Sequence, residues 1–418
     1  MSLFQVISAL IAIVALSAYA NYRLVRLPEA TGITAVALLV SLATIALGAA
    51  DPAVEHWVRQ VVAQIDFSAL VFHGLLGLLL FAGSLHLNVS SLAQSRWAIL
   101  VLATVGVVLS TALFGGAVFY GARLVGAPLD FIDCLVFGAL VSPTDPIAAL
   151  GLLGQAKVGR SLLNTITGEA LLNDGTGVVV FSVLAAIASG AQSPAPANVA
   201  MLLGREVFGG IGFGLAVGYG ASLLLGSVES SAVEILTTLA MATAGYAAAE
   251  ALGVSAPLAV VVMGLVIGNR DHGHEMSSRS RERLFTFWDL TDNLLNLLLF
   301  GLIGLELTAL AGEARRSLGL ALIAIPIALA VRFVSVAVPI AVLRRFERFE
   351  PACVRLLTWA GLRGALSVAL ALSLPESRAR APIVTATYAI ALFSTLVQAT
   401  TFEPLARRWT QPLRPRTG

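Results

Sequence analysis

The chain has 418 residues, of which 58% are hydrophobic and only 12% are charged. Soluble domains carry charge at about 25% of positions, so this composition excludes a water-soluble fold. A net charge of +2 and two cysteines without CxxC spacing also exclude a nucleic-acid surface, a disulfide framework and a zinc site.

Apolar segments alternate with proline, glycine and charged residues along the whole chain. They predict an all-α polytopic membrane protein with about 13 spans, because each span needs about 20 mainly apolar residues. Arg23 and Arg26 follow the first segment, whose own amino end is uncharged, so we interpret it as a retained helix rather than a signal peptide. The predicted spans are 3–20, 30–50, 67–87, 97–121, 130–152, 161–190, 200–226, 230–250, 254–268, 288–310, 317–342, 353–375 and 382–404.

The lysines and arginines outside these spans are concentrated in the odd-numbered loops and the C-terminal tail. Loops rich in positive charge stay in the cytoplasm, so the N-terminus is predicted outside and the C-terminus inside. The main cytoplasmic loops are then 268–288 and 344–355.

Charged residues inside apolar spans are costly and by default mark a transport pathway or a buried partner. Several acidic and basic residues lie inside the predicted spans, and together they are the main functional clue. They are Asp145, Glu169, Asp174, Glu306, Arg332 and Arg363.

The fifth span contains a helix break. Thr144 and Asp145 stand between Pro143 and Pro146, so two backbone donors are missing within four residues and the helical hydrogen bonds cannot continue. Carbonyls freed at such a break can coordinate a cation. A simple proline kink is the alternative, but it leaves the Asp145 carboxylate without a solvating group.

The twelfth span contains a second candidate break, where Gly361 and Gly364 flank Arg363. If the spans are numbered as six, one linker and six, the fifth and twelfth occupy corresponding places in two halves of opposite topology. Interrupted helices in such places indicate an inverted-repeat transporter.

The sixth span places Glu169 and Asn173 four residues apart on one helix face, with Asp174 beside them. A buried carboxylate either keeps a proton or binds a cation, so Asp174 can exchange H⁺ for Na⁺. The alternative is that Asp174 only hydrogen-bonds a neighbouring helix. Glu169 is expected to pair with an intramembrane arginine, Arg332 or else Arg363, and Glu306 is then expected to take the other.

Four segments, in order from the fifth span to the twelfth, carry a family resemblance. They read G-A-L-V-S-P-T-D-P-I-A, G-E-A-L-L-N-D-G-T-G, F-G-L-I-G-L-E-L and G-L-R-G-A-L-S-V-A-L-A-L-S-L-P. This set resembles the monovalent cation:proton antiporter-1 family, the NhaP and NHE type of sodium/proton exchangers. The first four spans match the family only in hydropathy.

The resemblance implies a homodimer of 13-helix subunits, in which a dimerisation domain flanks a mobile core domain that works by elevator-like alternating access. It also implies the following division: 1–90 and 229–312 for the two halves of the dimerisation domain, 91–192 and 313–406 for those of the core, 193–228 for the linker helix, and 407–418 for a short cytoplasmic tail.

The same resemblance implies roles for individual residues. Asp174 is the carboxylate shared by Na⁺ and H⁺, and Asn173 replaces the second aspartate of electrogenic relatives, which implies electroneutral one-for-one exchange. Thr144 offers its main-chain carbonyl to the transported Na⁺, and Asp145 neutralises the crossed half-helices. The resemblance also pairs Glu169 with Arg332.

One position departs from the family pattern. The family commonly has serine four residues before the ion-binding aspartate, and this chain has Ala170 there. A side-chain oxygen ligand is therefore missing, and selectivity among Na⁺, Li⁺ and K⁺ stays open.

The expected protein is a secondary active transporter of the bacterial inner membrane rather than an enzyme. Its partners are Na⁺, H⁺, membrane lipid and a second copy of the chain, with no cofactor and no nucleic acid. Two rival functions are a passive cation channel, which lacks a selectivity-filter repeat, and an intramembrane hydrolase using Asp145 and Asp174, which lacks the expected protease signatures.

Overall fold

The computed structural model describes residues 3–50, 67–93, 95–145, 159–193, 195–269, 278–347 and 349–410. Within these ranges it gives only the backbone at 305–316 and at a few positions beside the gaps. All regular elements in the described ranges are helices, as the apolar composition predicts. Nine of the described helical segments are long and apolar enough to cross a membrane.

The first half of the chain follows the predicted spans closely, with π-helical turns inserted in several helices. Its elements are α1 (Leu3–Ala20), η1 (Asn21–Val25), α2 (Glu29–Ala50), α4 (Phe67–Ala69), η2 (Leu70–Leu76), α5 (Gly77–Leu85), α6 (Val89–Ala93), α7 (Arg96–Val101), η3 (Leu102–Gly106), α8 (Val107–Leu124), α9 (Phe131–Val141) and α11 (Arg160–Ala188).

The second half contains the helix predicted as a linker and the second interrupted span. Its elements are α12 (Pro196–Leu225), α13 (Ser231–Ala240), η4 (Met241–Gly245), α14 (Tyr246–Ala251), α15 (Ala256–Gly268), α16 (Ser278–Leu343), α17 (Cys353–Ala360), α18 (Ala365–Leu372), α19 (Arg380–Phe393), η5 (Ser394–Gln398) and α20 (Ala399–Thr410).

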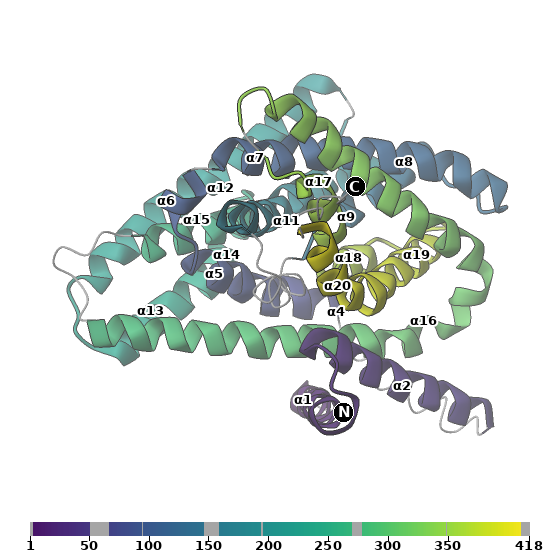
Figure 1. Ribbon diagram of the computed structural model, residues 1–418, viewed down its shortest axis with the longest axis horizontal. Coiled ribbons are helices and arrows are strands. Elements are labelled where there is room, and N and C mark those ends of the chain that lie inside the picture. Colours follow the sequence, from purple (N-terminus) through teal and green to yellow (C-terminus); the bar gives the residue numbers. More distant parts are fainter. Residues whose placement is uncertain are drawn as a thin grey trace, which may run out of the picture.

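The predicted spans 288–310 and 317–342 both lie within α16, which is helical throughout its 66 residues. Figure 1 shows its first arm along one edge of the molecule, a bend, and a second arm returning across the opposite edge. The first arm packs beside α2, and the hydroxyl of Thr34 on α2 donates to the carbonyl of Phe300 on α16. A single helical stretch therefore supplies both edges of the bundle.

Glycines at a spacing of four on α12 face α15. A Cβ added at Gly210 would meet the Ser255 carbonyl at 2.7 Å, and one at Gly218 would meet the Met263 Cα at 3.1 Å. Gly210, Gly214 and Gly218 therefore form a close-packed helix face, since only a residue without a side chain lets the two backbones approach this far.

Helices end at both predicted breaks, and the rest of the fifth span, 146–152, lies outside the described residues. In the fifth span, α9 ends at Val141 and the chain is non-helical from Ser142 to Asp145. In the twelfth span, residues 361–364 separate α17 from α18. Apolar side chains from α9, α18 and α19 pack into one buried cluster around these interruptions, which fixes the two non-helical segments inside the bundle.

Candidate ion site

The two interrupted segments meet each other. The backbone N–H of Asp145 donates to the carbonyl of Leu362 at 2.8 Å, an isolated antiparallel bridge between the fifth and twelfth spans. A Cβ at Gly364 would collide with the Asp145 carboxylate, so glycine is needed for this approach. The carboxylate thus lies at the amino end of α18, where the helix dipole favours negative charge.

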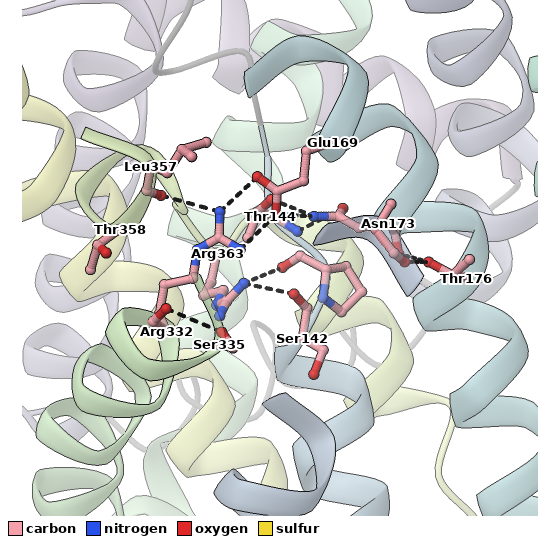
Figure 2. Close-up of polar contacts among 12 residues, drawn as sticks. Ser142, Thr144, Glu169, Asn173, Thr176, Arg332, Ser335, Leu357, Thr358 and Arg363 are labelled. Atoms are coloured by element: carbon pink, nitrogen blue, oxygen red, sulfur yellow. Dashed lines mark hydrogen bonds and ion pairs between the residues drawn. The ribbon is translucent and has the colours of Figure 1, made fainter. Parts of the chain in front are cut away.

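Arg363 occupies the complementary place at the carboxyl end of α9. Its Nη1 donates to the carbonyls of Ser142 at 2.8 Å and Pro143 at 2.9 Å, and its side chain is buried (Figure 2). These carbonyls lie at the helix break, so the guanidinium supplies donors that the interrupted helix lacks. The side chain of Glu306 lies outside the described residues, so its pairing with Arg363 stays a prediction.

Glu169 and Arg332 form a buried bidentate ion pair. The two Nη–Oε distances are 2.6 and 2.8 Å, and Nη2 of Arg332 also donates to the Leu357 carbonyl at 3.1 Å. Both side chains are buried. Of the two arginines expected from the sequence, Arg332 is therefore the one that lies against Glu169, and the pair joins α11 to the second arm of α16.

Asn173 extends this network to the fifth-span break. Its Nδ2 donates to the Thr144 hydroxyl at 2.7 Å and to Glu169 Oε1 at 3.3 Å, while its Oδ1 accepts from the Thr144 N–H at 3.2 Å (Figure 2). Its side chain is completely buried. We refer to Thr144, Glu169, Asn173 and Arg332 as the clamp, because together they tie the fifth-span break, α11 and the second arm of α16 to one another.

A cavity of about 300 Å³ lies beside the clamp. Thr144, Asp145 and Asp174 line it, together with residues of α5, the first arm of α16 and α18. The Asp174 carboxylate has no hydrogen bond or ion pair with a described residue. Asn173, Glu169, Arg332 and Arg363 are absent from the described cavity wall, so the residues predicted from the sequence divide into a lining group and a supporting group.

The sequence analysis missed five polar residues of the cavity: His86, Thr167, Asp289, Asp292 and Ser367. His86 Nε2 lies 3.1 Å from Asp289 Oδ1 at the more exposed end. A signal was present, because both aspartates fall inside the predicted span 288–310 and should have been counted with the other intramembrane charges. Ser367 carried no such signal, since serine is common in membrane helices.

Several carboxylates thus face one small space, but they do not form a compact metal centre. In the described ranges no group of three or more His, Cys, Asp or Glu side chains is placed to hold a metal ion. Ala170 is buried, so no hydroxyl comes from the position where the family commonly has serine. The described cavity wall thus offers acidic side chains from several separate segments.

Comparison with known proteins places this geometry in a family. The family model described as "Sodium/hydrogen exchanger, transmembrane" matches residues 9–408. The chain belongs to the sodium/hydrogen exchanger family. The exchanger is 43% identical to the Na⁺/H⁺ antiporter NhaP of Pseudomonas aeruginosa over 387 residues, which are 90% of each chain. It is 30% identical to the Na⁺/H⁺ antiporter NhaH of Halobacillus dabanensis, over 85% of this chain and 87% of that one.

A solved structure supports the same fold. The sodium proton antiporter MjNhaP1 of Methanocaldococcus jannaschii at pH 8 superposes with a TM-score of 0.69 at 17% sequence identity, covering 98% of the exchanger and 100% of that chain. The predicted antiporter fold, with its interrupted fifth and twelfth helices, is therefore confirmed. The exchanger is an integral membrane protein of a transporter family and not an enzyme.

Proposed function

We propose that this protein exchanges Na⁺ for H⁺ across the membrane, with Asp174 as the carboxylate that binds either ion. The observation that carries the proposal is the position of Asp174, in the wall of a cavity beside two crossed helix breaks and without a partner among the described residues. The named antiport activity of relatives at 43% and 30% identity supports the same ion pair. Li⁺ and K⁺ are the alternative cations.

The chemistry follows from competition for one negative charge. Desolvation makes an empty ionised carboxylate unfavourable, so the group holds either a proton or a cation. The main-chain carbonyl of Thr144 is the proposed second ligand, while Asp145 and Arg363 balance the two half-helix ends. Because Asp174 carries one positive charge in either direction, one Na⁺ moves for one H⁺ and no net charge crosses the membrane.

The positions of the clamp and the cavity relative to the two proposed domains support an elevator mechanism. All four clamp residues belong to the proposed core domain, 91–192 and 313–406, so the ion pair can hold the core as one body. The cavity, in contrast, lies between the core and the proposed dimerisation domain, 1–90 and 229–312, since α5 and the first arm of α16 form its other wall. Sliding of the core, linked through 193–228, would carry Asp174 past that wall.

Orientation and assembly complete the proposal. The exposed end of the cavity lies at His86 and Asp289, beside loops that the charge distribution assigns to the cytoplasm. The cavity would then open inward, with the N-terminus outside and the C-terminus in the cytoplasm. We expect a homodimer in the bacterial inner membrane, which contributes to pH homeostasis without a cofactor.

The proposal is tested with Asp174→Asn and Asp174→Ala in proteoliposomes that contain a pH-sensitive dye. Both variants are expected to lose Na⁺-driven dissipation of an imposed pH gradient. Asp133→Asn is the matched control, because Asp133 is a partly buried carboxylate of α9 that does not line the cavity. Exchange that persists in both Asp174 variants would reject the site.

Electroneutrality is tested by clamping the membrane potential with valinomycin at several K⁺ ratios. The initial rate of Na⁺/H⁺ exchange is expected to be the same at every potential. A rate that changes systematically with potential contradicts one-for-one exchange.

A further inference from the structure

The wall of the cavity opposite Asp174 also carries acidic side chains. Asp289 and Asp292 lie three residues apart on the first arm of α16, so they share one helix face. The Asp289 side chain is 64% exposed and contacts His86, whereas Asp292 is half-buried and forms no ion pair with a described lysine, arginine or histidine. Asp292 therefore contributes a deeper carboxylate without a cationic partner in the described part of the chain.

Ser367 supplies an independent observation. Its side chain is 1% exposed, it lies in the cavity wall on α18, and its hydroxyl has no hydrogen-bond partner among the described residues. A buried hydroxyl without a partner costs about 1–3 kcal/mol relative to a satisfied one. A cation that binds this oxygen, or a water of its hydration shell that hydrogen-bonds to the hydroxyl, would offset that cost.

From these observations we propose that Asp292 and Ser367 hold a second monovalent-cation position in the cavity, between the exposed end and Asp174. The inference deepens the proposed function and rests on it, since it adds a waiting place for the transported cation. The ligands are one carboxylate oxygen, one hydroxyl oxygen and water, which suit a partly hydrated alkali cation.

The position also has a place in the transport cycle. Asp292 belongs to the proposed dimerisation domain, whereas Ser367 and Asp174 belong to the core. The two ligands therefore come together only when the core stands as in this structure. A cation held between the domains relieves the repulsion among the carboxylates of Asp145, Asp174 and Asp292, and it passes to Asp174 when that group loses its proton.

The test is the apparent KM for Na⁺ and Li⁺ in proteoliposomes at a fixed pH gradient. Asp292→Asn is expected to raise the KM about tenfold and Ser367→Ala about threefold, as loss of one charged and one neutral ligand would do, with maximal rates within about twofold of the wild type. The conservative variants Asp292→Glu and Ser367→Thr keep an oxygen ligand and are expected to stay near the wild-type KM. They also separate a ligand effect from misfolding. Misfolding would lower the maximal rate in both variants of the same residue, whereas loss of a ligand raises the KM only in Asp292→Asn and Ser367→Ala.

Two matched controls distinguish a binding position from a general effect. Thr385→Ala removes another buried hydroxyl without a described partner, on α19 away from the cavity wall, and should leave the KM unchanged. Asp289→Asn removes a carboxylate from the same wall. If Asp289→Asn raises the KM as much as Asp292→Asn does, the wall attracts cations only through its overall charge and the proposed position is overturned.

A binding measurement separates this inference from the proposed function. The melting temperature of purified Asp174→Asn protein is followed against NaCl, with choline chloride keeping the ionic strength constant. Stabilisation by Na⁺ should persist and should disappear when Asp292→Asn is added. Absence of any Na⁺ effect in Asp174→Asn, or its persistence in the double variant, overturns the second position. Neither result bears on whether Asp174 carries the exchange, which the transport assay of Asp174→Asn alone decides.

Discussion

Asn173 and Asp174 are neighbours in the sequence, but they belong to two different kinds of polar region. Asn173 lies in the clamp, where it is completely buried. Its side-chain amide forms hydrogen bonds with Thr144 and Glu169. Asp174 faces the cavity and has no such partner among the described residues. A satisfied polar network holds a structure in place, whereas a carboxylate that lines a cavity without a described partner is available to a ligand.

The comparison also separates structural from functional charges. The clamp pairs opposite charges at hydrogen-bonding distance, so its members need no external ion. The cavity wall instead carries several carboxylates, and we propose that one of them, Asp174, binds the transported cation or the proton. Variants of the two regions test this difference.

The largest effect is expected from Arg332→Met, which leaves Glu169 buried without its partner. Removal of one member of a buried ion pair costs about 3–5 kcal/mol, so the melting temperature of the purified protein should fall steeply. Adding Glu169→Gln should recover part of the lost stability, because the uncompensated charge of Glu169 is then removed as well. A double variant that is less stable than Arg332→Met alone would contradict the role of the clamp as a charge pair.

The next effect concerns the crossing of the two breaks. Gly364→Ala introduces a Cβ that collides with the Asp145 carboxylate, and overpacking of this kind costs about 1–3 kcal/mol. We expect Na⁺/H⁺ exchange to fall at least about tenfold, since about 1.4 kcal/mol at the site already corresponds to that factor. Gly212→Ala on α12 is the control, because a Cβ there meets nothing within 4 Å. Equal activity of the two variants would show that the close approach is not needed.

Asn173→Ala removes the hydrogen bonds between α11 and the fifth-span break. The Thr144 N–H and hydroxyl are then buried without this partner, and we expect a loss of about 2 kcal/mol in the free energy of unfolding. The melting temperature should fall more than in Asn164→Ala, a change to a less buried amide on the same helix. If the clamp only supports the site, the KM for Na⁺ should change less in Asn173→Ala than in Asp292→Asn.

The smallest effect is expected from His86→Asn at the exposed end of the cavity. The contact between His86 and Asp289 involves a side chain that is 64% exposed, and exposed ion pairs contribute about 0–1 kcal/mol. Stability should therefore change by less than about 1 kcal/mol, and the exchange rate should stay within about twofold of the wild type. A tenfold change in rate would show that the exposed end takes part in ion binding.

The sequence predicted most of the fold because the bilayer imposes strong local rules. Apolar length marks each span, and two prolines within four residues must interrupt a helix wherever they occur. The continuity of α16 across 305–316 was not predicted, because the charged residues between its arms resemble a loop. Helical hydrogen bonds continue through that segment nonetheless.

The candidate site was predicted in part. Thr144 and Asp145, at the break of the fifth span, and Asp174, on the sixth, all line the cavity, and their roles in ion binding stay predictions. The choice between Arg332 and Arg363 as the partner of Glu169 could not be made, because 163 residues separate Glu169 from Arg332 and 194 from Arg363 along the chain. Periodicity relates residues within one helix and carries no information about which distant helix lies opposite.

The sequence by itself determined that the chain spans a membrane, where its helices break, and which charges must be buried. These properties follow from the free-energy cost of placing polar groups in lipid. That cost depends on the residues of each segment and not on its neighbours in the fold. Only the tertiary structure decided that the two breaks meet. It also decided that Asn173 lies in the clamp while Asp174 lines the cavity, and that Asp292 and Ser367 line the same cavity. Those relations depend on how the helices pack around one another, and packing joins residues that the linear order keeps apart.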